Sequence, residues 1–134
     1  MNIAIRYLSK LGHTKEIAEA MAEELGVQAI SITEAPHLEE PVDLLFLGGA
    51  PYANVMDSLL RTYAKELDPS KVGKVVLFTT SNWSRRTVRS LKKILREKGI
   101  EVADEYFYAH MLKIKPGVAR AKAFARGWCT CNTH

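Results

Sequence analysis

Short apolar runs alternate with amphipathic stretches along the whole chain, and this alternation is the feature that most limits the fold. Strand-like apolar sequence covers residues 2–8, 27–32, 42–49, 74–80 and 100–109. Helical periodicity covers residues 14–25, about 57–67, 87–99 and 117–128. Strands that alternate with helices predict a parallel sheet, because parallel strands need a crossover connection. The sequence therefore predicts an α/β fold, a three-layer α/β/α sandwich around a five-stranded parallel sheet.

Each expected helix has one apolar face, which we expect to be buried against the sheet. The first helix places there Ile17, Ala18, Met21, Ala22 and Leu25. The second places there Leu59, Leu60, Tyr63, Ala64 and Leu67. The last places there Val118, Ala121, Phe124, Ala125 and Trp128. The proline-bounded segment 33–41 is expected to form a loop or a single turn.

Size and composition indicate one globular domain. The chain has 134 residues, of which 47% are hydrophobic and 25% charged, which is enough for one core and too few for two. No apolar run approaches the roughly 20 residues that a membrane span needs, and the N-terminus has no signal-peptide pattern. We expect a soluble, cytoplasmic protein without membrane contact, with its domain at residues 1–128 and a C-terminal tail at 129–134.

The charge balance is mildly basic, with 19 Lys and Arg against 15 Asp and Glu. The basic stretches at 84–93 and 118–127 are better explained as solvated helix faces than as a nucleic-acid patch. The two cysteines, Cys129 and Cys131, lie in the tail, so disulfides are not the basis of the fold. A C-x-C pair lacks the further ligands of a metal site, and we expect no metal.

The segment "SKLGHT" joins the first strand to the first helix and has the features of an anion-binding loop. It supplies the hydroxyls of Ser9 and Thr14 and the backbone N–H groups from Leu11 to Lys15. A helix N-terminus has unpaired donors and partial positive charge, so a phosphate fits there. The segment lacks the first glycine of a P-loop. From this loop alone, Thr14 is explained equally well as a phosphate ligand or as a helix cap.

Two aromatic residues follow neighbouring strands of the expected sheet. We expect the five strands to lie in the order 2-1-3-4-5, in which the first and third strands flank the point where the order reverses. In such sheets ligands bind beyond the carboxyl ends of the strands at that point. The loops after the first, third and fourth strands meet at that edge. Tyr52 follows the third strand and Trp83 follows the fourth, and two such rings can enclose a flat heterocycle by offset stacking. Together with the phosphate loop, they favour a ligand site over simple packing of each ring beneath its loop.

These segments resemble the flavodoxin family, small FMN-binding electron carriers, and the resemblance covers nearly the whole chain. In "SKLGHT", Ser9, Gly12 and Thr14 match the phosphate loop S/T-x-S/T-G-x-T. The segments "DLLFLGGAPYAN" and "VLFTTSNW" look like the second and third flavin loops of the family. No long insertion splits the fifth strand, which is typical of the short-chain group. The chain departs from the family in its positive net charge and at three positions, Leu11, Ala53 and Asn82.

The resemblance implies a flavodoxin-like electron-transfer protein that binds FMN. It implies redox partner proteins of unknown identity, no nucleic-acid partner, and a monomer or weak dimer. It implies an electron carrier more than an enzyme, without catalytic residues of its own. The implied cofactor-binding residues are Ser9, Lys10, Leu11, Gly12, His13, Thr14, Ala50, Pro51, Tyr52, Ala53, Asn54, Thr80, Ser81, Asn82 and Trp83.

Two alternatives stay open at this point. One is a small FMN-dependent reductase of quinone or porphyrinogen type, because residues 9–25 also resemble the opening of flavodoxin-type protoporphyrinogen oxidases. The other is a flavin-free interaction module that uses the basic helix at residues 87–98. Turnover with quinones would favour the first alternative, and a colourless protein that gains no FMN on titration would favour the second.

Overall fold

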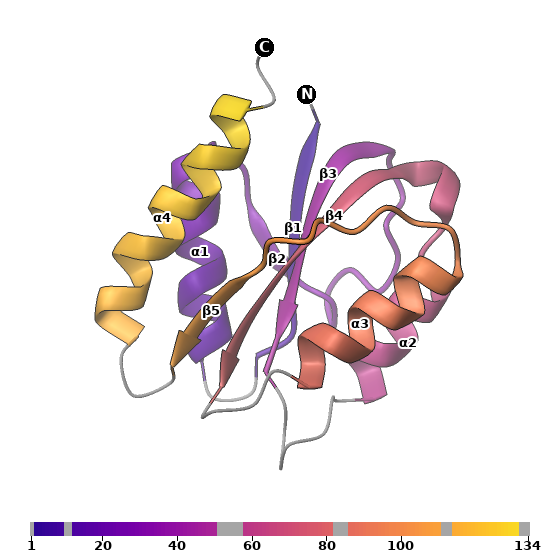
Figure 1. Cartoon of the computed structure of the whole chain (residues 1–134), viewed down its shortest axis with the longest axis horizontal. Helices are drawn as coiled ribbons and strands as arrows, with labels where there is room; N and C mark the ends of the chain where they lie inside the picture. The colour runs from indigo at the N-terminus through magenta and orange to yellow at the C-terminus, as the bar shows by residue number, and fades with distance from the viewer. Residues whose placement is uncertain (1, 10–11, 51–57, 82–85, 111–113, 132–134) are drawn as a thin grey trace.

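A parallel sheet forms the middle layer of the molecule. The computed structural model describes residues 2–9, 12–50, 58–81, 86–110 and 114–131. The strands found there are β1 Ile3–Tyr7, β2 Ala29–Ser31, β3 Val42–Gly49, β4 Val72–Ser81 and β5 Phe107–His110. All neighbouring strands pair in parallel, in the order β2-β1-β3-β4-β5 (Figure 1). The predicted sheet and strand order are confirmed.

Helices cover both faces of this sheet (Figure 1). On one face lie α1 His13–Leu25 and α4 Ile114–Cys131, and on the other lie α2 Ser58–Glu66 and α3 Arg86–Glu97. A short 3₁₀ helix, η1 Pro69–Lys71, precedes β4. This is the predicted three-layer α/β/α sandwich. No helix in the described ranges has the length and apolar character that crossing a membrane requires.

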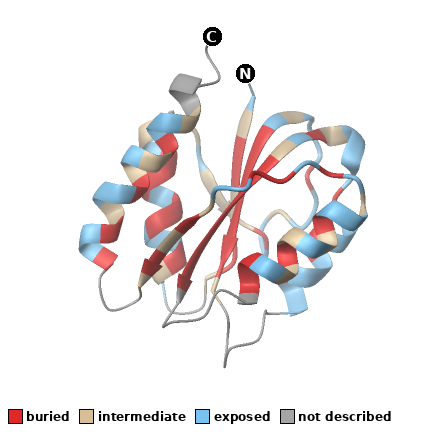
Figure 2. Ribbon diagram, in the orientation of Figure 1, coloured by how far each residue is buried: buried red, intermediate tan, exposed pale blue. Residues whose placement is uncertain are grey.

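The core consists of two apolar clusters, one on each side of the sheet. Successive strand residues point to opposite faces, so Leu45 and Leu47 join the cluster under α2 and α3, while Phe46 joins the cluster under α1 and α4. The inner strands β3 and β4 are buried along most of their length (Figure 2). Burial on both faces explains why these strands are continuous apolar runs without polar alternation.

The last helix packs on α1 mainly through small side chains. Ala121 and Ala125 are fully buried, whereas Val118, Phe124 and Trp128 are only partly buried. Small residues allow two helix backbones to approach closely, and the larger side chains cover the edges of the contact. The backbone of α4 stays helical through Cys131, three residues beyond the boundary at 128 that we set for the domain.

The predicted fifth strand at residues 100–109 is wrong in its first half. Val102 forms an isolated bridge to Val75, and regular pairing with β4 begins only at Phe107, opposite Phe78. Val75 and Phe78 are three positions apart on β4, whereas their partners Val102 and Phe107 are five positions apart. Two residues between Val102 and Phe107 therefore have no partner in the ladder. The segment between them leaves the sheet, and Asp104 forms an ion pair with Arg96 at 2.9 Å.

The predicted apolar face of α2 is also wrong at one position. Leu60, Tyr63, Ala64 and Leu67 are buried, but Leu59 is 54% exposed. The buried positions follow the i, i+3, i+4, i+7 spacing of one helical face. Leu59 precedes this series by one residue and therefore lies about 100° around the helix axis from Leu60.

Ion pairs join α1 to α4, and one of them predicts a pH-dependent stability. Arg126 donates to Glu24 at 2.8 Å, and this hydrogen bond lowers the pKa of Glu24. A lowered pKa in the folded state means that the interaction stabilises the fold above the unfolded pKa and is lost as the pH falls through the folded value. Glu24→Gln should therefore lower the melting temperature slightly at pH 7, and the difference from the wild type should vanish in acid.

The effect should be small because the Arg126 side chain is 64% exposed and solvent screens the pair. Thermal unfolding at several pH values measures it, and Glu39→Gln is the matched control, since no ion pair of Glu39 occurs among the described residues. A deficit of Glu24→Gln that stays constant down to pH 2 would contradict the assignment.

Candidate functional site

The strands β1, β3 and β4 are parallel neighbours and end at the same edge of the sheet, which we call the carboxyl edge (Figure 1). Leu8, just after β1, donates its amide to the carbonyl of Gly48 at 3.0 Å, which holds the start of the first loop beside β3. Ala50 follows β3, and Thr80 and Ser81 end β4. The residues expected to begin the three flavin loops therefore lie along a common edge.

The N-terminus of α1 has amide donors of the kind that bind anions in other proteins. Gly12 occupies the N-cap position with a left-handed φ of 90° and makes no side-chain cap. No described group accepts a hydrogen bond from the first-turn amides of His13, Thr14 and Lys15. The turn itself is held by Ser9, whose Oγ accepts from the amide of Gly12 at 3.0 Å. Unpaired amides at the positive end of a helix are a general anion-binding arrangement.

The hydroxyl of Thr14 pairs with a residue from the end of β4. Its Oγ1 lies 2.7 Å from Oγ1 of Thr80, and both side chains are buried, with exposures of 1% and 0%. Of the two explanations open from the sequence, the helix cap is wrong, because Thr14 lies inside the first turn and does not cap it. The contact joins the phosphate-loop segment to β4 across 66 positions of sequence.

The donor direction within this pair decides what Thr14 can bind. Either oxygen can be the donor, and one hydroxyl hydrogen suffices to make the bond. If Thr80 donates, the hydrogen of Thr14 is available to an acceptor at the helix N-terminus. An anionic oxygen would accept it and would favour this direction. The hydroxyl pair and the open amides therefore fit a phosphate group.

Two further buried threonines, Thr79 and Thr87, were missed by the sequence reasoning. Thr79 follows Phe78 in β4 and Thr87 lies in the first turn of α3, so both belong to the same edge of the sheet. Both are 0% exposed, and neither Oγ1 has a hydrogen-bond partner among the residues that the structure describes. A buried hydroxyl without a partner is destabilising by about 1–3 kcal/mol. These two threonines add buried polar groups to the carboxyl end of β4 and the start of α3. The Thr-Thr doublet that ends the fourth apolar run was the available signal.

The other predicted site residues are placed as follows. His13 and Ala50 are partly buried at the edge, and the backbone of Ser81 pairs in register with His110 of β5. The remaining ones lie outside the described residues: Lys10, Leu11, Pro51, Tyr52, Ala53, Asn54, Asn82 and Trp83.

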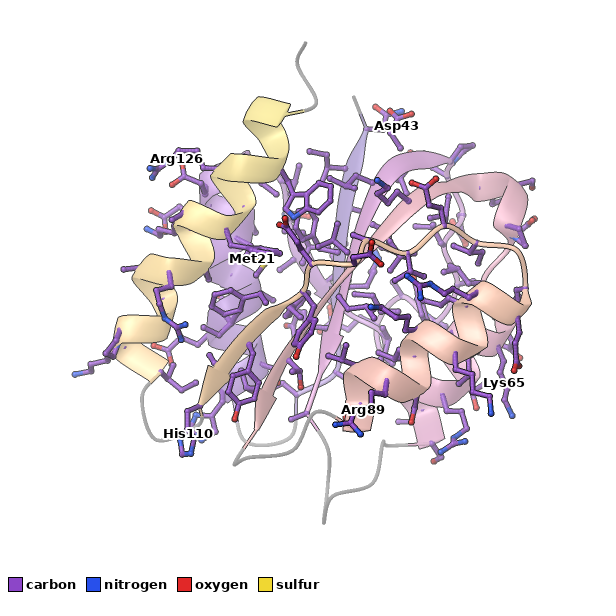
Figure 3. The ribbon with its side chains drawn as sticks, in the orientation of Figure 1. Met21, Asp43, Lys65, Arg89, His110 and Arg126 are labelled. Atoms are coloured by element: carbon purple, nitrogen blue, oxygen red, sulfur yellow. The ribbon has the colours of Figure 1, made fainter. Side chains whose placement is uncertain are left out.

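The described residues contain no cluster of three or more His, Cys, Asp or Glu side chains with the spacing of a metal site. His110 ends β5 at the carboxyl edge and is labelled in Figure 3. The hydroxyls and backbone amides described at this edge suit an anionic organic ligand.

Comparison with known proteins identifies the fold. No protein-family model and no curated protein sequence matches the chain. Among solved structures, oxidised flavodoxin 1 from Bacillus cereus is similar with a TM-score of 0.81 at 17% identity, over 97% of this chain and 98% of that one. A flavodoxin from the domain Archaea is similar with a TM-score of 0.81 at 19% identity, over the full length of both chains.

A third solved structure is a Fusobacterium nucleatum flavodoxin mutant bound to flavin mononucleotide, with a TM-score of 0.71 at 17% identity, over 93% of this chain and 92% of that one. The likeness extends over nearly all of each protein. The chain therefore has the flavodoxin-like fold.

Proposed function

We propose that this chain binds FMN non-covalently at the carboxyl edge and serves as an electron-transfer protein. The observation that carries the proposal is the set of hydrogen-bond donors at the N-terminus of α1. It combines the open first-turn amides with the Thr14 hydroxyl, which Thr80 holds at 2.7 Å. The flavodoxin-like fold supports the same ligand, since one similar structure has flavin mononucleotide bound.

Two groups of residues would recognise different parts of the cofactor. The hydroxyls of Ser9 and Thr14 and the amides that follow Gly12 would hold the phosphate. Tyr52 and Trp83 would flank the flavin ring, and backbone groups near Ala53 and Asn82 would contact its polar edge. Bound FMN supplies the electron chemistry, and the protein supplies binding, orientation and the electrostatic surroundings.

We expect the cofactor to be FMN and not FAD. The donor set lies directly against the helix N-terminus, so it suits a terminal phosphate monoester better than the bridging diphosphate of a dinucleotide. Freshly purified protein should be yellow, and heat release followed by chromatography should recover FMN. Protein purified without pigment should bind added FMN more tightly than FAD or riboflavin in a fluorescence titration.

Recovery of FAD would contradict the assignment of the phosphate site. A colourless protein that binds no added flavin would support the alternative of a flavin-free interaction module. If FMN is bound, rapid turnover with quinones would assign a reductase, whereas slow turnover with efficient oxidation by protein acceptors would support the electron carrier.

A further inference from the structure

The positive charge of the chain is concentrated on one layer of the sandwich. Helices α2 and α3 contain seven of the 19 Lys and Arg residues but only two of the 15 Asp and Glu residues. The rest of the chain therefore has 12 basic and 13 acidic residues. The net charge of +4 arises entirely from the α2–α3 layer.

The two helical layers also differ in how their charges are paired. On the other layer, α4 is tied to α1 by Lys122–Glu23 at 3.3 Å and Arg126–Glu24 at 2.8 Å. On the α2–α3 layer, Arg96 pairs with Asp104. Within the part of the chain that the structure describes, the following basic residues have no ion pair: Arg61, Arg89, Lys92 and Lys93.

The spacing of these cations makes them repel one another. Arg89, Lys92, Lys93 and Arg96 follow each other at three and four residues along one helix. Like charges at these spacings lower the stability of a helix by a few tenths of a kcal/mol per pair. A negatively charged surface laid against α3 would remove this repulsion. We use the name basic face for the group of residues formed by Arg61 and Lys65 of α2 and by Arg89, Lys92, Lys93 and Arg96 of α3.

The basic face adjoins the candidate cofactor site. Helix α3 starts at Arg86, directly beyond the loop that follows β4, and its first turn contains the buried Thr87. Arg89 lies near this end of α3, and Lys65 lies on the same layer, whereas Arg126 lies on the opposite one (Figure 3). Lys98 donates to the backbone carbonyl of Lys65, which ties the end of α3 to α2. A protein docked on this layer would reach the edge where the flavin is proposed.

The side chains of the basic face suit a folded acidic protein better than a nucleic acid. Proteins that hold single-stranded nucleic acid combine a basic groove with exposed aromatic rings on which bases stack. The one aromatic residue of α2 and α3 is Tyr63, which is 3% exposed and belongs to the core. Charge attraction without stacking is typical of transient docking between proteins of opposite charge.

We propose that the basic face is the docking surface for an acidic electron-transfer protein. This inference rests on the proposed function for the redox role of the partner. The charge attraction does not depend on flavin. Because the charges are exposed, the attraction should act mainly on the rate of association and should weaken when the salt concentration shortens the Debye length.

The test uses the full chain, with and without FMN, and two probe proteins of opposite net charge. An acidic plant-type 2Fe–2S ferredoxin and a basic cytochrome c serve as probes, and binding is measured at low and high salt. Arg89→Gln combined with Lys93→Gln removes two charges from the basic face. Lys115→Gln combined with Arg126→Gln removes one lysine and one arginine charge from α4 and is the matched control.

Ferredoxin should bind at low salt, and the α3 double variant should weaken its binding by about five-fold or more. The α4 double variant should change it by less than about two-fold, and neither variant should weaken cytochrome c. With FMN bound, two reduced ferredoxins would each give one electron, and the flavin would take up both electrons with a proton from solvent. The rate of this reduction should fall in the α3 variant in parallel with binding.

Equal weakening by both double variants would overturn the proposal, because net charge alone would then explain the attraction. Absence of ferredoxin binding would also overturn it. The same holds if single-stranded DNA binds more tightly than ferredoxin, in a salt-dependent way, and the α3 variant abolishes that binding. The proposed function fails separately. If the FMN-free protein binds ferredoxin on α3 but takes up no flavin, the docking surface stands and the FMN assignment does not.

Discussion

Replacing Thr14 with alanine is expected to weaken FMN binding by about 10- to 100-fold, with little change in riboflavin binding. The Thr14 hydroxyl can donate to a phosphate oxygen because Thr80 lies within 2.7 Å and can supply the hydrogen bond that holds it. A hydrogen bond to a charged group contributes about 1.5–3 kcal/mol. Riboflavin has no phosphate, so it reports every effect of the substitution other than the lost phosphate contact. Fluorescence titration of the FMN-free protein measures both affinities.

Two further variants isolate the hydroxyl from the shape of the side chain. Thr14→Ser keeps the hydroxyl and should retain most of the FMN affinity. Thr80→Val removes the hydroxyl that pairs with Thr14 but leaves the Thr14 hydroxyl in place, so its effect should have the same direction and be smaller. Because both residues are buried, thermal unfolding is recorded for each variant, and FMN affinities are compared among folded proteins.

Equal weakening of FMN and riboflavin by Thr14→Ala would mean that the residue supports the local fold and does not contact the phosphate. A Thr80→Val variant with unchanged FMN affinity would show that Thr14 needs no orientation by β4. Either result would revise the phosphate site without affecting the assignment of the fold.

Replacing Gly48 with alanine is expected to destabilise the fold by about 1–3 kcal/mol or more. A Cβ atom built on Gly48 would lie 2.2–2.5 Å from three atoms of the Phe78 ring. These residues are paired neighbours on β3 and β4, and Phe78 is 0% exposed. The ring has no space to withdraw, because close-packed interiors contain few voids. Urea unfolding measures the change in the free energy of unfolding.

The same contact predicts that the two residues are energetically coupled. Phe78→Ala should lower the free energy of unfolding by about 3–5 kcal/mol, because it leaves a cavity in the core. In the double variant, the new methyl group at residue 48 would occupy part of that cavity. The double variant should therefore lose less stability than the sum of the two single variants, and coupling of this kind between contacting residues is typically about 0.5–3 kcal/mol.

Gly127→Ala is the matched control for the glycine substitution. Gly127 lies in α4, and an added Cβ there has no atom within 4 Å. Alanine is favoured over glycine in a helix by about 1 kcal/mol, so this variant should be more stable than the wild type. If Gly48→Ala is equally well tolerated, or if the effects at 48 and 78 are additive, the ring is not packed over Gly48 as the structure places it.

Local sequence pattern was sufficient to predict most of the fold. The strand predicted at residues 42–49 is found with the same bounds, because a doubly buried strand is a continuous apolar run. The edge of the sheet that holds Thr14 and Thr80 also followed from the strand order, since parallel strands end on the same side. Their direct contact did not follow, because a pair 66 residues apart depends on how α1 is set against β4.

The errors have physical causes that a local pattern does not contain. The apolar alternation of residues 100–109 is typical of a strand, but the register with β4 is fixed at Val102 and again at Phe107, and the two surplus residues interrupt the ladder. Leu59 was assigned to the buried face because it is apolar, yet burial depends on where the helix starts and how it is rotated. Thr79 and Thr87 were missed because threonine is common at strand ends and helix starts.

The edges of the sheet have a consequence for how the protein behaves at high concentration. The two outer strands, β2 and β5, have three and four residues, whereas the inner strands β3 and β4 have eight and ten. An exposed strand is a template on which another chain can add a strand, and long flat edges promote aggregation. Outer strands this short offer few backbone groups for such pairing. The two surplus residues before Phe107 interrupt the ladder and limit β5 to four residues, so we expect less strand addition between molecules than a longer outer strand would allow.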